Sequence, residues 1–239
     1  MTIAPNAIWV ALLASCVLAS SSASAGRPST QELARVLSKA DLRQLPTLGD
    51  PSASVLVLEF GDFECPYCRQ HAATTMAEIS DKFVRTGKVR YVFAQFPLDE
   101  HKEARLLAAA ARCAHLQGKF WPMHDTLFRG QEPADAAALQ QLAAQMGLSP
   151  ADFGRCLQDS STSTEINAEK HLGERLGVQG TPWFVIGRGG DGHWSDVTQA
   201  FGARPFEFFD HAISGLLEAS RPKVQPEGAI AASAPSTAQ

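Results

Sequence analysis

The sequence lacks the charge surplus and the internal repeats that would point to particular classes of protein. Its 239 residues carry 21 lysines and arginines against 25 aspartates and glutamates, a formal net charge of -4. A protein that binds nucleic acid or an anionic membrane surface usually has a basic surplus, so neither partner is predicted. The composition, 45% hydrophobic and 19% charged, is that of a globular chain long enough for one sizeable domain or two small ones.

The first 25 residues contain no aspartate, glutamate, lysine or arginine. Their apolar run, from about Ala7 to Leu18, is short for a membrane-spanning helix and is followed by small residues. Because the stretch ends in Ala-Ser-Ala, the A-x-A form of a secretory cleavage site, residues 1–25 are predicted to be a signal peptide cleaved near Ala25. The protein would then be periplasmic or otherwise exported. Basic residues normally begin a signal peptide, so an uncut N-terminal anchor is one alternative, and a lipid anchor at Cys16 is another.

Cysteine is scarce, with five residues in the whole chain. Removal of the signal peptide would also remove Cys16 and leave Cys65, Cys68, Cys113 and Cys156. An exported chain meets an oxidising compartment, where an even set of four can form two bridges in three possible pairings.

The chain also lacks the pattern of a zinc site. Cys65 and Cys68 form a C-x-x-C motif, but no second C-x-x-C or H-x-x-x-H stands at zinc spacing, and His71 would lie on the same helix. Three further histidines stand beside no cysteine or carboxylate in a metal pattern and are predicted to be cap, surface or core residues: His101, His115 and His124. No metal and no bound cofactor are predicted.

Apolar runs and glycine stops outline a βαβ unit in the first half of the chain. The run Ser54–Phe60 predicts a buried strand, residues 66 to about 86 a helix that stops at Gly87, and residues 88–98 a second strand. Such a unit closes with parallel strands and a right-handed crossover. Residues 26–53 are predicted to hold a lead-in helix.

The second half of the chain is first helical and then returns to strands. Residues 99–177 are alanine-rich with glycine stops, which predicts an all-helical insertion. Two strands joined by a glycine-rich turn and a closing helix follow within residues 178–219, and the Ala-, Pro- and Ser-rich residues 220–239 are predicted to be a disordered tail. Without the insertion, residues 54–98 and 178–219 have the element order of a thioredoxin fold, an α/β class.

The CPYC motif, residues 65–68, suits redox chemistry. A thiol exchanges with a disulfide only as the thiolate, so a redox cysteine needs exposure and a stabilised anion. Cys65 stands where the helix begins, so free backbone N–H groups and the positive end of the helix dipole would face its sulfur. We expect Cys65 to be an exposed nucleophile and Cys68 a less accessible resolving thiol, which together form a redox-active disulfide. A purely structural bridge is the alternative, although so short a spacer gains little chain entropy.

Three stretches together resemble one family: VLEFGDFECPYC, AARCAHLQGKFWPMHDTLF and GVQGTPWFVIG. They resemble the DsbA-like exported thiol-disulfide oxidoreductases, a thioredoxin fold with a helical insertion, and the similarity covers residues 54–219. On matching positions the resemblance implies that Cys65 is the nucleophile, Cys68 the resolving cysteine, and Thr181 and Pro182 a substrate-binding loop with a cis bond. The sequence alone favours a trans bond, since only about 5 to 6% of X-Pro bonds in folded proteins are cis.

Three residues outside the motif are also candidates for a role, and for Glu59 the resemblance implies it. Glu59 matches a buried acidic residue that helps proton transfer at the second sulfur, and burial in an apolar strand would raise its pKa toward working pH. The alternative is a carboxylate at a strand edge in water. Cys113 and Cys156 fall in two predicted helices of the insertion. Their apolar surroundings favour a structural disulfide over a second redox relay.

The resemblance implies an exported thiol-disulfide oxidoreductase. We expect an oxidase that donates the Cys65–Cys68 disulfide to cysteine-containing exported proteins through a mixed disulfide, with a membrane protein as redox partner. No long dimerisation region precedes the fold, as it does in the isomerases of the family, which favours the oxidase. A disulfide isomerase or reductase remains an alternative, as does a non-catalytic module that binds extended peptides beside Pro182.

Overall fold

The computed structural model describes residues 27–130, 135–190 and 192–220. The predicted signal peptide with Cys16, and the predicted tail beyond Ser220, lie outside these residues. Within the described ranges, no helix has the length and apolar character needed to cross a membrane.

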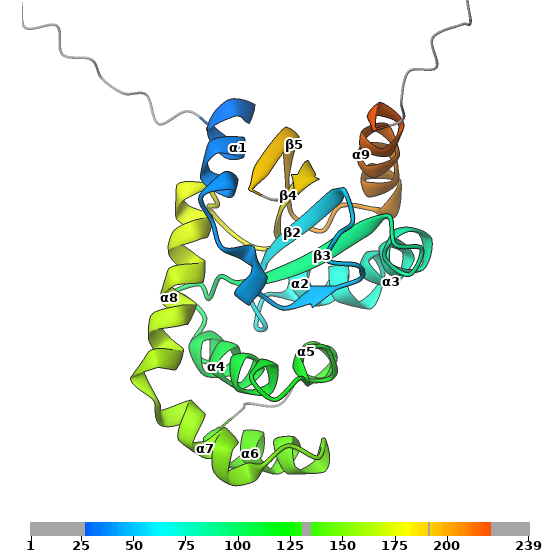
Figure 1. Ribbon diagram of the computed structural model, residues 1–239. Helices are drawn as coiled ribbons and strands as arrows, with labels where there is room; N and C mark the ends of the chain where they lie inside the picture. Colours follow the sequence, from blue (N-terminus) through cyan, green and yellow to red (C-terminus); the bar gives the residue numbers. More distant parts are fainter. Residues whose placement is uncertain (1–26, 131–134, 191, 221–239) are drawn as a thin grey trace, which may run out of the picture.

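The described residues form a mixed five-stranded sheet in the order β1-β3-β2-β4-β5 (Figure 1). Strands β2 and β3 are parallel, and the other neighbouring pairs are antiparallel. The strands are β1 (Thr47–Leu48), β2 (Val55–Gly61), β3 (Val89–Gln95), β4 (Trp183–Gly190) and β5 (His193–Phe201). The predicted βαβ unit and the later hairpin are confirmed, whereas β1, which pairs with the edge of β3, was not predicted.

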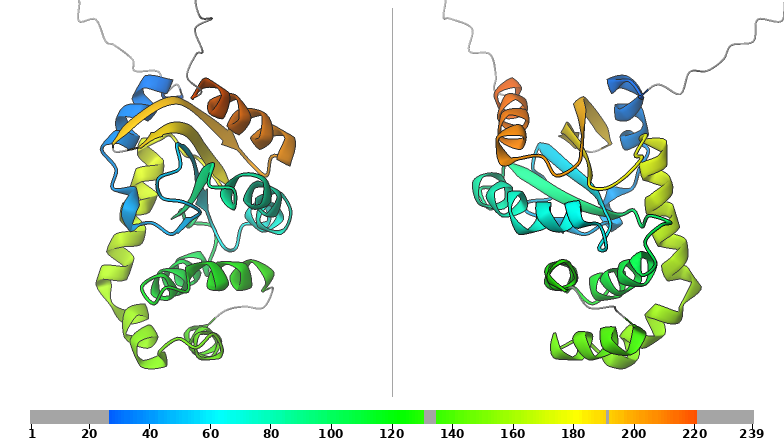
Figure 2. Two further views of the ribbon diagram at one scale, coloured as in Figure 1. Left: turned by 45° about the vertical axis from the view of Figure 1, so that its right-hand side comes forward. Right: turned by 180° about the vertical axis from the view of Figure 1, so that it is seen from behind.

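Helices cover both faces of the sheet (Figures 1 and 2). On one face lie α1 (Thr30–Ser38) with the short η1 (Leu42–Gln44), and the upper part of α8 (Ser160–Arg175). On the other face lie α3 (Thr75–Ile79) and α9 (Phe206–Ala219). The sheet is therefore the middle of three layers, as a thioredoxin fold requires.

Strand β2 is the centre of the core and is buried at all seven positions. Leu56, Leu58 and Phe60 pack toward α1 and α8, whereas Val55 and Val57 pack toward α3 and α9. Because side chains alternate along a strand, the remaining polar residue of β2, Glu59, shares the face of Val55 and Val57. An acidic side chain is thus placed under the helices that follow the CPYC motif.

The single helix predicted from Pro66 to about Thr86 is wrong. The structure divides it into α2 (Pro66–Ala73), α3 and the π-helical turn η2 (Ser80–Val84). Thr74 breaks the first helix with φ -125° and ψ -82°, and the Thr75 hydroxyl donates to the Arg204 carbonyl at 3.2 Å. The segment still ends as predicted at Gly87, whose φ of 70° suits a residue without a Cβ.

The helical insertion forms a separate group beside the sheet (Figure 2). It contains α4 (Ala104–His115), α5 (Phe120–Arg129), α6 (Ala136–Gln145) and α7 (Pro150–Gln158), and α8 runs from this group back to the sheet. Gly173 of α8 allows this return, because a Cβ there would stand 2.7 Å from the Phe96 ring. A disulfide between Cys113 of α4 and Cys156 of α7 ties two of these helices together, with their Cα atoms 5.7 Å apart.

Candidate active site

The CPYC motif lies where the sheet meets the insertion. Cys65 is the N-cap of α2 with an extended backbone, and Pro66 is the first helical residue. The side chains of Cys65 and Cys68 belong to the same buried cluster as Phe120 and Phe128 of α5. Both cysteines are free thiols, and 4% of Cys65 and 0% of Cys68 are exposed. The predicted exposure of Cys65 is therefore wrong for this state of the protein, although Cys68 is the more buried of the two.

The two thiols have opposite electrostatic surroundings. A hydrogen bond from Cys68 lowers the pKa of Cys65 to about 6, against the effect of partial burial, with further help from the Thr181 side chain and the backbone N–H groups of Cys68 and Tyr67. Burial raises the pKa of Cys68 well above its ordinary value, and the charges of Cys65 and Glu59 add to this shift. At neutral pH the first thiol is thus ionised in large part and the second is protonated.

The loop before β4 covers Cys65. The Thr181–Pro182 peptide bond is cis. The Cys65 thiol donates to the Thr181 carbonyl at 3.3 Å, across 116 residues of sequence. The Thr181 hydroxyl is buried and has no hydrogen-bond partner among the described residues. Because the Thr181 side chain also lowers the pKa of Cys65, its hydroxyl is placed to donate to the sulfur once the thiol has lost its proton.

Glu59 lies in the central strand and is 1% exposed, so the alternative of a carboxylate at a wet strand edge does not hold. Burial raises its pKa to about 8, although a hydrogen bond from Tyr91 opposes the shift. The Tyr91 hydroxyl donates to Oε2 at 2.5 Å, whereas Oε1 has no partner among the described side chains. Near neutral pH, Glu59 therefore holds a proton that it can give, and only its ionised form can take one.

A histidine extends this buried contact. Nε2 of His71, on α2, lies 2.9 Å from the Tyr91 oxygen. Since Tyr91 gives its only proton to Glu59, Nε2 of His71 carries the hydrogen of that contact. Burial lowers the pKa of His71 to about 3, which agrees with a neutral ring. No role was predicted for Tyr91 from the sequence, where the one signal is a single tyrosine in the apolar second strand.

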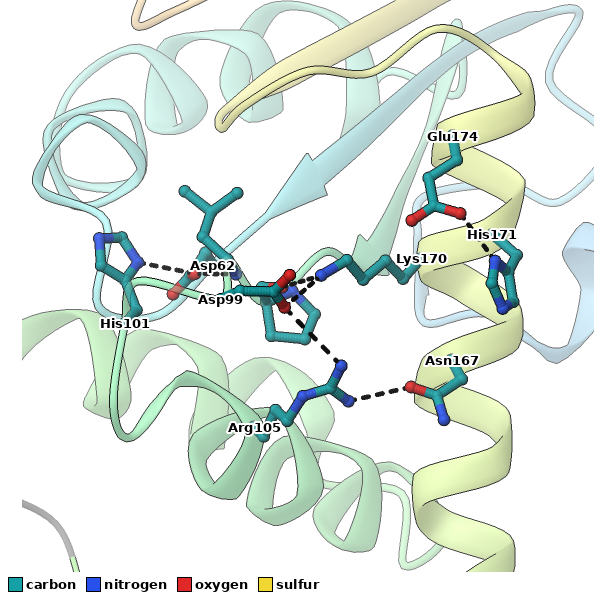
Figure 3. Close-up of polar contacts among 10 residues, drawn as sticks. Asp62, Asp99, His101, Arg105, Asn167, Lys170, His171 and Glu174 are labelled. Carbon is teal, nitrogen blue, oxygen red and sulfur yellow. Dashed lines mark hydrogen bonds and ion pairs between the residues drawn. The ribbon is translucent and has the colours of Figure 1, made fainter.

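Asp62 connects the CPYC turn to the start of the insertion. Its Oδ1 accepts from the Glu64 backbone N–H, and its Oδ2 from the Leu98 backbone N–H, both at 2.8 Å. Nδ1 of His101 also lies 2.8 Å from Oδ2 (Figure 3). The Asp62 carbonyl in turn accepts from the Cys65 N–H at 3.1 Å. From the sequence His101 was predicted only to be a cap, surface or core residue, and its contact with Asp62, 39 residues away, was not predicted.

The second cysteine pair joins two helices of the insertion, and Cys113 belongs to the same buried cluster as Cys65 and Cys68. Of the three pairings open from sequence, the structure contains Cys113–Cys156, a bridge over a sequence separation of 43. Cys113 lies within α4 and is 1% exposed. Among residues 27–130, 135–190 and 192–220, no group of three or more histidines, cysteines or carboxylates could hold a metal ion.

Comparison with known proteins agrees with this geometry. Residues 42–193 match the family model described as Thioredoxin. The chain is 37% identical over 139 residues to the Na(+)/H(+) antiporter NhaA 3 of Salinispora tropica, a match that covers 58% of this chain and 21% of the antiporter. It is 28% identical over 145 residues to the probable disulfide bond formation protein D of Bacillus cereus, a match that covers 57% of this chain and 67% of the relative.

A solved structure shares the fold. The crystal structure of Wolbachia pipientis alpha-DsbA1 superimposes with a TM-score of 0.67 at 24% identity, covering 80% of this chain and 97% of that one. The family match spans more than half of this chain and contains both cysteines of the CPYC motif. The chain therefore belongs to the thioredoxin family.

Proposed function

We propose that the protein is an exported thiol-disulfide oxidoreductase that donates the Cys65–Cys68 disulfide to folding proteins. The observation that carries the proposal is the contrast between the two thiols. Cys65 has a lowered pKa at the start of α2, whereas Cys68 is fully buried in the first turn of that helix and has a raised pKa. The name of the Bacillus cereus relative, a probable disulfide bond formation protein, supports the same activity.

The reaction would run in two exchanges. A substrate thiolate attacks the Cys65 sulfur, the Cys65–Cys68 bond breaks, and Cys68 leaves as a thiolate that takes a proton from Glu59. A second substrate thiolate then attacks the substrate sulfur of the mixed disulfide, and Cys65 leaves as a thiolate. The substrate has lost two electrons and gained a disulfide, and the protein is left with the Cys65 thiolate and the Cys68 thiol. A second protein, which we place in the membrane, must then reoxidise the pair.

The proposed direction of electron flow rests on which redox state of the Cys65–Cys68 pair the surrounding groups stabilise. Only the reduced form carries a Cys65 thiolate, so every group that lowers the pKa of Cys65 favours the reduced protein over its disulfide. Those groups include the Cys68 thiol and the Thr181 side chain. A pair whose reduced form is stabilised is an oxidant, which supports donation of disulfides over their reduction. The charge-free segment with its A-x-A ending at residues 1–25 supports export.

Redox titration in glutathione buffers tests the proposal. An oxidase should have a potential well above that of thioredoxin, about -270 mV, and Cys68→Ala should trap substrate proteins on Cys65 as mixed disulfides. A potential near that of thioredoxin would instead indicate a reductase. A bridge that stays oxidised below about -300 mV, with no trapped substrate, would leave only a peptide-binding module.

A further inference from the structure

Asp62 and His101 form an ion pair between two segments that flank the redox motif. Asp62 lies in the turn that leads into α2, and His101 precedes α4, the first helix of the insertion. None of the Asp62 side chain is exposed, whereas 23% of the His101 side chain is. The imidazole can therefore exchange its proton with solvent while Asp62 holds its position.

A carboxylate at position 62 has an electrostatic consequence for Cys65. The Asp62 carbonyl accepts from the Cys65 N–H at 3.1 Å, so the two residues close one hydrogen-bonded turn. A negative charge in that turn opposes ionisation of a nearby thiol. A protonated His101 against the same carboxylate cancels this repulsion, because it places a positive charge beside the negative one.

The charges around His101 favour its protonated form. Partial burial disfavours its charged form, but the hydrogen bond and charge of Asp62, followed by Glu64 and Cys65, raise its pKa above the ordinary value. Asp99 is directed away, toward Lys170 of α8 and Arg105 of α4 (Figure 3). Besides Asp62, which His101 contacts directly, the charges that favour protonated His101 are those of Glu64 and the Cys65 thiolate.

We propose that His101, held by Asp62, is a positioning residue whose positive charge stabilises the Cys65 thiolate and makes the Cys65–Cys68 pair a stronger oxidant. The inference rests on the proposed function of Cys65 and adds a residue from the insertion to it. Coupling between two titrating groups is reciprocal: if the thiolate favours the imidazolium, the imidazolium favours the thiolate to the same extent. The CPYC dipeptide, Pro66 and Tyr67, contains no cation, so this charge comes from outside the motif.

The first test compares variants by the ultraviolet absorbance of the thiolate and by the equilibrium constant with glutathione. His101→Gln should raise the pKa of Cys65 by about 0.5 to 1 unit and reduce the oxidising equilibrium constant by about three- to tenfold. His101→Lys, which keeps a positive charge, should retain the values of the unchanged protein. The matched control is His171→Gln, because His171 also contacts a carboxylate, that of Glu174, but is exposed on α8. It should change neither value.

The second test needs no variant and therefore does not depend on folding of His101→Gln. The pKa of His101, followed by NMR, should be higher in the reduced protein than in the disulfide form, where no thiolate exists. The ring signals of His171, which is exposed on α8, are the control and should coincide in the two forms.

Three results would overturn the inference: equal His101 pKa values in the two redox states, a His101→Gln protein that matches His171→Gln, or a His101→Lys protein as impaired as His101→Gln. None of these touches the proposed function, which fails separately if the unchanged protein does not oxidise thiols.

Discussion

The two cysteine pairs of this chain occupy contrasting positions on helices of the same molecule. Cys65 caps the start of α2, and Cys68 lies in the first turn of that helix. Cys113 lies inside α4 and is joined to Cys156 of α7. Backbone N–H groups are free to contact a sulfur only at a helix start, because those in the interior donate to carbonyls of the helix itself. A position at the start of a helix therefore suits Cys65 and Cys68 to thiol-disulfide exchange, whereas a position inside a helix suits Cys113 to a structural crosslink.

Variants that disable one cysteine pair at a time should lose different properties, the first catalytic activity and the second stability. Cys65→Ala should reduce oxidation of substrate thiols to the uncatalysed rate, since no other described thiol has a lowered pKa. The double variant Cys113→Ala with Cys156→Ala should keep the rate but lower the free energy of unfolding by about 4 kcal/mol, because the bridge closes a long loop in the unfolded chain. Oxidative refolding of a reduced protein and denaturant titration measure the two quantities.

The distinction between an exchange pair and a structural pair would be wrong if the double variant lost exchange activity while it remained folded. Cys113 and Cys156 would then act as a second redox relay.

The proton-transfer role of Glu59 can be examined in the same way. Glu59→Gln keeps the shape of the side chain but cannot carry the proton, so oxidation of the reduced protein by oxidised glutathione should slow by about 100-fold. In the unchanged protein this rate should rise as the pH increases through about 8, because Glu59 must be ionised before it takes the Cys68 proton. Stopped-flow measurements across pH 6 to about 9 would show whether the rise disappears in the variant.

Glu78→Gln is the matched control, since Glu78 is an exposed carboxylate on the neighbouring α3. If Glu59→Gln had the same rate and the same pH profile as this control, Glu59 would be only a buried structural residue.

The smallest expected effect concerns the pH dependence of Cys65 itself. A thiol with a pKa of about 6 is ionised above that pH and protonated below it, so alkylation of the reduced protein by iodoacetamide should fall as the pH drops through about 6. In Cys68→Ala the midpoint should move to higher pH, because the hydrogen bond that most lowers the pKa of Cys65 is gone. A midpoint near 9 in the unchanged protein would contradict the stabilised thiolate.

The parts of the fold that depend on local pattern could be predicted from the sequence. The apolar run that forms β2, the stop at Gly87 and the entry of α7 at Ser149 and Pro150 all follow from neighbouring residues. The break at Thr74 could not be predicted in this way. It accompanies a hydrogen bond from Thr75 to Arg204, which joins segments 129 residues apart.

The candidate site likewise has one part that could be predicted from adjacent residues and another part that could not. The CPYC motif is visible in the sequence because its residues are adjacent. Tyr91 reaches Glu59 only through the register in which β3 pairs with β2. His101 reaches Asp62 only because the chain returns past the motif before it enters the insertion. Such contacts between distant segments depend on tertiary packing, which cannot be predicted from the spacing of neighbouring residues in the sequence.

The three hydrogen bonds to the Asp62 side chain also bear on how this protein can be engineered. Glu64 lies in the same loop as Asp62, whereas Leu98 and His101 belong to another segment. A graft of residues 60–71 into a foreign scaffold would carry the cysteines and the carboxylate but leave two of the three donors behind. Residues 60–71 therefore do not carry all the contacts of Asp62, and a graft designed to keep these contacts needs residues 97–101 as well.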